Sequence, residues 1–288
     1  MASSGSITWP SATEPIWRLN WRLSSNPEGV VISHAFFRDQ RVFWKASTPS
    51  LRVQYDVQCG PYKDPLDDYV AQPSSRCESE VCAYSYVHNG LRALAIEFYM
   101  EIGWYRLTHR WVFWEDGRIM PRLYSAGLQC DCNHRHHAYW RFDFDMSGWP
   151  DDAAFEFNNN AGNSGWGPGW SLIATEESRI KDPNTARSWA VLDKPSERGY
   201  HILPGHHDGF ADDFSRRDVW AVRYRGAEDR RGNQGSASDD MLNNDLTGES
   251  LDGEDVVFWY CGHLFHEHAH GGDEWHHVGP DLVPFGNW

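Results

Sequence analysis

The chain has 288 residues, enough for one large domain or two ordinary ones with a well-buried core. Its formal net charge is −15 and it has no basic run, so we expect no nucleic-acid partner. No uninterrupted apolar stretch approaches the roughly 20 residues of a membrane helix and no apolar leader is visible, so we expect a cytoplasmic protein without a membrane partner.

Short runs rich in β-branched and aromatic residues follow one another along the chain, separated by turn clusters. No stretch holds a helical period with caps, so the pattern predicts an all-β protein built as a large β-sandwich. We expect a disordered tail over residues 1–12, one domain over residues 13–288, and a surface loop over residues 227–250. In chain order, the expected strands are Gly29–His34, Gln40–Lys45, Leu51–Tyr55, Ala93–Met100, His109–Trp114, Ala138–Asp145, Ala153–Asn158, Ser188–Leu192, Asp218–Tyr224 and Asp255–Tyr260.

A histidine pair opens one of these strand-like runs. His134 and His136 are two residues apart, so in a strand both point to one face, while His137 faces away. Neutral imidazoles suit copper, zinc, iron or nickel, and a third ligand is required. Periodicity does not choose the third ligand among the histidines that follow the last predicted strand. Three histidines on strands also suit zinc, so a zinc hydratase or hydrolase stays an alternative. These candidates are His263, His266, His268, His270, His276 and His277.

Several spaced motifs resemble the copper amine oxidases and occur in the order of that family's catalytic domain. They are Trp21-Arg22-Leu23, Asn26-Pro27-Glu28-Gly29-Val30-Val31, Trp44-Lys45-Ala46-Ser47, Ile102-Gly103-Trp104-Tyr105, Trp111-Val112-Phe113, Asp116-Gly117-Arg118-Ile119, His134-Arg135-His136, Arg141-Phe142-Asp143, Val219-Trp220-Ala221-Val222 and Glu254-Asp255-Val256-Val257. The similarity runs from Trp21 to Gly286 and implies the family's catalytic β-sandwich and a homodimer.

The resemblance also implies a copper site and an organic cofactor. His134 and His136 have the spacing of the family's metal pair, and His266 lies seven residues beyond Trp259, where the family has its third copper ligand. Tyr105 falls on the tyrosine that becomes topaquinone in the family, six residues before a tryptophan.

Four carboxylates complete the implied site. Asp68 is the candidate general base, reached by counting about twelve residues onward from Asp56, which resembles an upstream Tyr-Gly-Asp of the family. Asp143, Asp145 and Asp255 resemble the oxygen ligands of a peripheral calcium site, and hard carboxylates suit calcium.

The implied activity is oxidation of a primary amine by dioxygen, and 16 tryptophans favour an aromatic-lined pocket for a primary amine or an aromatic metabolite. Trp104 and Arg106 flank Tyr105, where the family has asparagine and an acidic residue. This difference leaves two alternatives open: a copper enzyme without a quinone that carries out a tailoring reaction on a small molecule, and a catalytically silent metal-binding domain.

Overall fold

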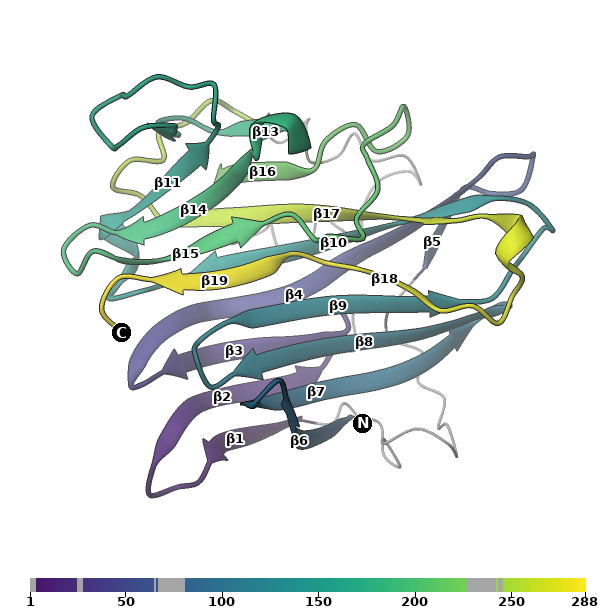
Figure 1. The fold of residues 1–288 in the computed structure, drawn as a ribbon, viewed down its shortest axis with the longest axis horizontal. Helices are drawn as coiled ribbons and strands as arrows, with labels where there is room; N and C mark the ends of the chain where they lie inside the picture. The colour runs from purple at the N-terminus through teal and green to yellow at the C-terminus, as the bar shows by residue number, and fades with distance from the viewer. Residues whose placement is uncertain (1–3, 25–27, 65, 67–80, 227–241, 243–245) are drawn as a thin grey trace.

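The computed structural model describes residues 4–24, 28–64, 66, 81–226, 242 and 246–288. Two antiparallel sheets face each other and form a sandwich, and long strands run the full length of the molecule (Figure 1). The predicted all-β sandwich is confirmed. Within the described residues, no helix is long and apolar enough to cross a membrane.

The first sheet is centred on three strands that lie side by side, β4, β10 and β17. Its order is β1 (Ser4–Pro10), β2 (Pro15–Leu23), β3 (Val30–Phe37), β4 (Gln40–Tyr55), β10 (His134–Phe144), β17 (Val256–His266), β16 (Val219–Arg223) and β13 (Glu177–Arg179), with β5 (Tyr62–Asp64) paired to β4.

The second sheet covers one face of the first. Its order is β12 (Trp170–Leu172), β11 (Asp152–Phe157), β14 (Ser188–Asp193), β15 (Arg198–Leu203), β19 (Asp281–Phe285), β9 (Ile119–Ala126), β8 (Tyr105–Trp114), β7 (Leu91–Ile102) and β6 (Cys82–His88), with β18 (His276–Val278) paired to β9. Three short 3-10 helices lie in connections among the described residues: η1 (Trp149–Asp151), η2 (Pro183–Thr185) and η5 (His268–His270).

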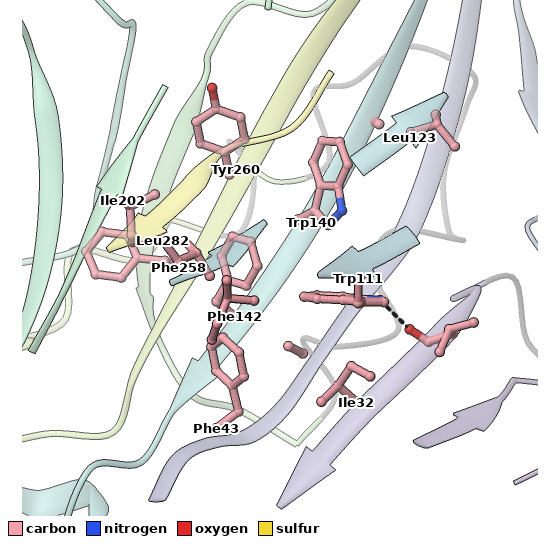
Figure 2. Close-up of a cluster of buried hydrophobic side chains, with 14 of the residues drawn as sticks. Ile32, Phe43, Trp111, Leu123, Trp140, Phe142, Ile202, Phe258, Tyr260 and Leu282 are labelled. Atoms are coloured by element: carbon pink, nitrogen blue, oxygen red, sulfur yellow. Dashed lines mark hydrogen bonds between the residues drawn. The ribbon is translucent and has the colours of Figure 1, made fainter. Parts of the chain in front are cut away.

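The core lies between the sheets, and large aromatic side chains from both inner faces fill it (Figure 2). Trp140 and Phe142 project from β10, and Trp111 projects from β8 across from them. The indole nitrogen of Trp111 donates to the carbonyl of Val30 at 2.9 Å, which satisfies its polar atom inside the core. This packing fixes β8 and β10 relative to each other.

One part of the expected domain layout is wrong. Residues 4–10 form β1, which pairs along its length with β2, instead of a disordered tail. The reason is that more buried and exposed side chains alternate along this segment. Trp9 is buried, and its indole nitrogen donates to Ser85 Oγ at 2.7 Å. Most of the loop expected over residues 227–250 lies outside the described residues.

A tight turn sets the start of β8. β7 ends at Ile102 and β8 begins at Tyr105, so two residues, Gly103 and Trp104, join them. Gly103 has a φ of 58°, a left-handed conformation that favours glycine, and a Cβ there would lie 2.7 Å from the Gln129 side chain. The turn therefore makes Tyr105 the first residue of β8, where its side chain faces the first sheet.

Candidate metal centre

The three predicted copper ligands lie at one end of the sandwich, beside the coil of η5 at the right of Figure 1. His134 begins β10 and His266 ends β17, and the two residues are direct partners in the antiparallel ladder. The ring centroid of His134 lies 5.0 Å from that of His136 and 4.9 Å from that of His266. All three side chains are buried. Antiparallel pairing thus brings together residues that are 132 positions apart, from residue 134 to residue 266.

Four of the six ring nitrogens of this cluster lack hydrogen-bond partners. Both nitrogens of His134, Nδ1 of His136 and Nδ1 of His266 are buried without a hydrogen bond. His266 Nε2 lies 3.0 Å from the carbonyl oxygen of Gly271, which can only accept, so the proton sits on Nε2 and the Nδ1 lone pair is free. His136 Nε2 lies 3.3 Å from Ser125 Oγ. Buried polar atoms without partners are costly, and a bound cation would satisfy them.

Burial also sets the protonation state of these imidazoles. It lowers the pKa of His134 to about 4, with a further contribution from His266, and lowers that of His136 well below its usual value. The pKa of His266 is lowered as well, chiefly by burial. At neutral pH the three rings are therefore uncharged, which is the form that ligates transition metals.

Tyr105 packs against the same imidazoles. Its ring centroid lies 4.9 Å from that of His134 and 4.7 Å from that of His136. Its hydroxyl donates to the hydroxyl of Tyr55 at 2.9 Å, and Tyr55, the last residue of β4, is the ladder partner of His134. Burial raises the pKa of Tyr105 far above its usual value and that of Tyr55 to about 12. Both phenols are therefore neutral at pH 7.

Asp64 is a buried carboxylate that the sequence reading did not select. It ends β5, its Oδ2 is buried without a hydrogen bond, and burial raises its pKa to about 7. Its charge contributes to the raised pKa of both Tyr55 and Tyr105, and it pairs with Leu51 on β4, four residues before Tyr55. Asp68, the residue predicted as general base, lies outside the described residues. No local sequence pattern separates a buried aspartate from a solvated one in this stretch.

A disulfide braces the loop that leads into β10. Cys59 and Cys130 are bonded, whereas Cys132, two residues before His134, is a buried free cysteine. The bond joins the segment after β4 to the segment before β10, two strands that carry Tyr55 and His134. It closes a loop over a sequence separation of 71, which restricts the unfolded chain.

The predicted calcium residues line one cavity at the other end of β10. Asp143, Asp145 and Asp255 surround a space of about 360 Å³. Asp145 pairs with Arg41, and Asp143 pairs with Arg141 at 3.1 Å. A fourth carboxylate, Asp152, was not selected from the sequence; burial and then Asp193, Asp145 and Asp255 raise its pKa to about 9. Carboxylate oxygens are the ligands that calcium takes.

The donor atoms of His134, His136 and His266 do not all lie within 4.8 Å of one another. Two other groups among the described residues meet this criterion. The first is His137, Cys261 and His263, all buried. The second is His270, Glu274 and His276, on the surface, with the His276 ring centroid 4.3 Å from that of His266. The chain therefore contains a buried His-Cys-His group that can hold a metal, in addition to the cluster beside Tyr105.

Comparisons with known proteins identify the fold. No family model and no curated protein matches the sequence. Among solved structures, a copper-containing benzylamine oxidase from Hansenula polymorpha is similar at a TM-score of 0.74 and 17% identity, covering 97% of this chain and 59% of its own. Lysyl oxidase from Pichia pastoris is similar at 0.71 and 16% identity, covering 94% and 51%. An Aspergillus nidulans amine oxidase is similar at 0.72 and 15% identity, covering 98% and 55%.

The chain thus spans a little over half the length of these oxidases, and the match extends over nearly all of its own residues. The low identity shows likeness of fold alone. This protein has the fold of the copper amine oxidase catalytic domain.

Proposed function

We propose that this protein is a copper-dependent oxidoreductase that converts a small primary amine, dioxygen and water into an aldehyde, ammonia and hydrogen peroxide. The observation that carries the proposal is the contact of Tyr105 with His134 and His136, at ring-centroid distances of 4.9 and 4.7 Å. The tyrosine is enclosed with imidazoles that each have at least one buried ring nitrogen without a hydrogen-bond partner. A phenol held this way is placed for oxidation beside a redox-active ion.

The residues fit copper. Three neutral imidazoles are a donor set that copper accepts, and they leave a coordination position open. His134, His136 and His266 would hold the ion. When bound, copper would supply redox chemistry with dioxygen, and topaquinone derived from Tyr105 would supply a carbonyl group that reacts with amines.

The neighbouring side chains position the tyrosine and move a proton. The hydroxyl of Tyr55 accepts the hydrogen bond of Tyr105 and fixes the direction of the phenol. Asp64 would serve as the general base. Its pKa of about 7 leaves a large fraction ionised at neutral pH and keeps the carboxylate basic enough to take a proton. Calcium at the Asp143, Asp145 and Asp255 cavity would stabilise the far end of the sheet.

Aerobic loading with copper tests the proposal directly. Protein purified without metal is expected to acquire a visible absorbance band and a positive redox-cycling quinone stain after addition of copper and dioxygen. Protein loaded with zinc under the same conditions is the control and is expected to stay colourless. Absence of the band after copper uptake has been verified would contradict the quinone-dependent activity.

Asp64 gives a prediction for the pH profile. Because only the ionised carboxylate accepts a proton, kcat/KM for an amine is expected to rise as the pH increases through about 7. Asp64→Asn is expected to lower kcat/KM by about 10² to 10⁴ and to remove this rise. The matched control is Asp56→Asn, since Asp56 is exposed and pairs with Arg135 on the surface. An unchanged pH profile in Asp64→Asn would assign the base elsewhere.

A second candidate keeps copper and omits the quinone. It is favoured by the setting of Tyr105, whose flanking residues face outward: Trp104 is 77% exposed, and Arg106 pairs with Asp273 at 3.0 Å. Tyr105 itself is a neutral phenol with its hydroxyl engaged by Tyr55. In this case the ion would act on dioxygen or a substrate oxygen directly, and turnover would survive Tyr105→Phe.

A further inference from the structure

The strands that carry the copper cluster hold a second set of metal-type donors on their opposite face. His137 follows His136 by one residue, so it points away from Tyr105. Its ladder partner on β17 is His263, and Cys261 lies two residues before His263, on the same face. His137, Cys261 and His263 are all essentially inaccessible to solvent. Because side chains alternate along a strand, this group lies on the opposite face of the sheet from His134, His136 and His266.

The three donor atoms are spaced for one ion. His137 Nδ1 lies 2.9 Å from His263 Nδ1, and Cys261 Sγ lies 3.9 Å from His263 Nδ1. Tetrahedral zinc with Zn–N near 2.0–2.1 Å and Zn–S near 2.3 Å places two nitrogens about 3.3 Å apart, and a nitrogen and a sulfur about 3.6 Å apart. The observed separations lie within a few tenths of an ångström of these values, so small side-chain shifts suffice.

A carboxylate orients one of the imidazoles. His263 Nε2 lies 3.2 Å from Asp218 Oδ1, and Asp218 is buried, with Oδ2 accepting from the backbone nitrogen of Lys181 at 2.9 Å. Asp218 Oδ1 lies where it can accept the proton of Nε2 when Nδ1 binds an ion. Carboxylate, histidine and metal in this order are the usual arrangement around metal-bound histidines.

The surroundings of the group favour an enclosed ion over a substrate site. The Phe214 ring lies over His137 at a centroid distance of 5.3 Å. Ser215 Oγ lies 3.4 Å from Cys261 Sγ and 2.9 Å from the Tyr139 hydroxyl. His137 Nε2 is buried without a partner. One thiolate and two imidazoles in a closed setting suit a borderline-soft transition ion, either zinc or copper, but not calcium or magnesium.

We propose that His137, Cys261 and His263 bind one transition-metal ion, zinc or copper, at a second site on the far face of β10 and β17. The ion ties these two strands together and, through Asp218, fixes the segment that enters β16. The site is independent of the proposed oxidase activity, because it shares no ligand with the cluster beside Tyr105.

Cobalt provides the probe, because a cobalt–thiolate bond gives a near-ultraviolet charge-transfer band that histidine ligands alone do not give. Metal-free full-length protein is titrated with Co²⁺, and the band and the bound metal are measured. Wild type is expected to show the band, and Cys261→Ser is expected to lose it together with one equivalent of metal. His134→Ala is expected to retain the band, which separates failure of this site from failure of the copper site.

Cys132→Ser is the matched control, since Cys132 and Cys261 are the buried free cysteines of the described part of the chain. It is expected to keep the full band, and this result assigns the thiolate even if Cys261→Ser does not fold. A wild-type protein without the band, or a Cys261→Ser variant that keeps both band and stoichiometry, would overturn the proposal. Parallel loading with Zn²⁺ and Cu²⁺, followed by dialysis, identifies the ion that is held more tightly.

Discussion

Replacing Tyr105 by phenylalanine is expected to abolish amine-dependent production of hydrogen peroxide while leaving copper stoichiometry unchanged. The substitution removes only the phenol oxygen, and the ring that packs against His134 and His136 remains. Without that oxygen no quinone can form, so the loss is expected to be complete, not partial. The hydrogen bond to Tyr55 is also lost, at a cost of about 1 kcal/mol, which the fold tolerates.

The matched control for this experiment is Tyr55→Phe. Tyr55 accepts the hydrogen bond but lies outside the cofactor position, so its variant is expected to form the quinone more slowly and to keep measurable turnover. Peroxide production and bound copper are measured on the same samples. Full turnover in Tyr105→Phe would contradict a quinone from this residue and would favour the copper enzyme that acts without one.

Replacing His134 by alanine is expected to lower copper affinity at the Tyr105 site by at least about 100-fold and to abolish amine oxidation. This ring occupies the middle of the cluster, because its centroid lies within 5.0 Å of His136 and 4.9 Å of His266. Both of its nitrogens are buried without a well-formed hydrogen bond. Loss of a hydrogen-bond partner of a metal ligand lowers metal affinity by about 10-fold to 100-fold, and loss of the ligand itself lowers it further.

His268→Ala is the control for this substitution. His268 is an exposed histidine that pairs with Asp131 at 2.5 Å, on the turn that follows β17. Its variant is expected to bind copper as wild type does. Copper bound per chain is counted by elemental analysis after dialysis, with the Cys261→Ser background removing any contribution from the second group. Equal copper retention by the His134→Ala and wild-type proteins in that background would contradict the ligand assignment.

Strand alternation allowed part of the site to be predicted from the sequence. Because His134 and His136 are two residues apart in a strand, they had to share a face, and the structure also places His137 on the other face. Tyr105 was found by resemblance alone, since no periodicity distinguishes it from other tyrosines that precede a strand. The core aromatic residues that hold these strands follow from the same alternation of buried positions.

The remainder depends on strand register and burial, which a single sequence does not reveal. On periodicity alone His263 and His266 were equal candidates, and the resemblance selected His266. In the structure His263 pairs with His137, whereas His266 pairs with His134. The high pKa of Asp64 arises from burial, which its turn-like local sequence does not reveal. The N-terminal strand was missed because a short Ser/Gly-rich segment became ordered only by pairing with β2.

The central claim is that three imidazoles from β10 and β17 hold one copper ion beside Tyr105. Crystals of the copper-loaded protein, measured at the copper absorption edge, test it most directly. We predict an anomalous peak about 2.0–2.2 Å from one nitrogen of each of His134, His136 and His266. Copper found only at His137, Cys261 and His263, or only at the surface group of His270, Glu274 and His276, would contradict the claim.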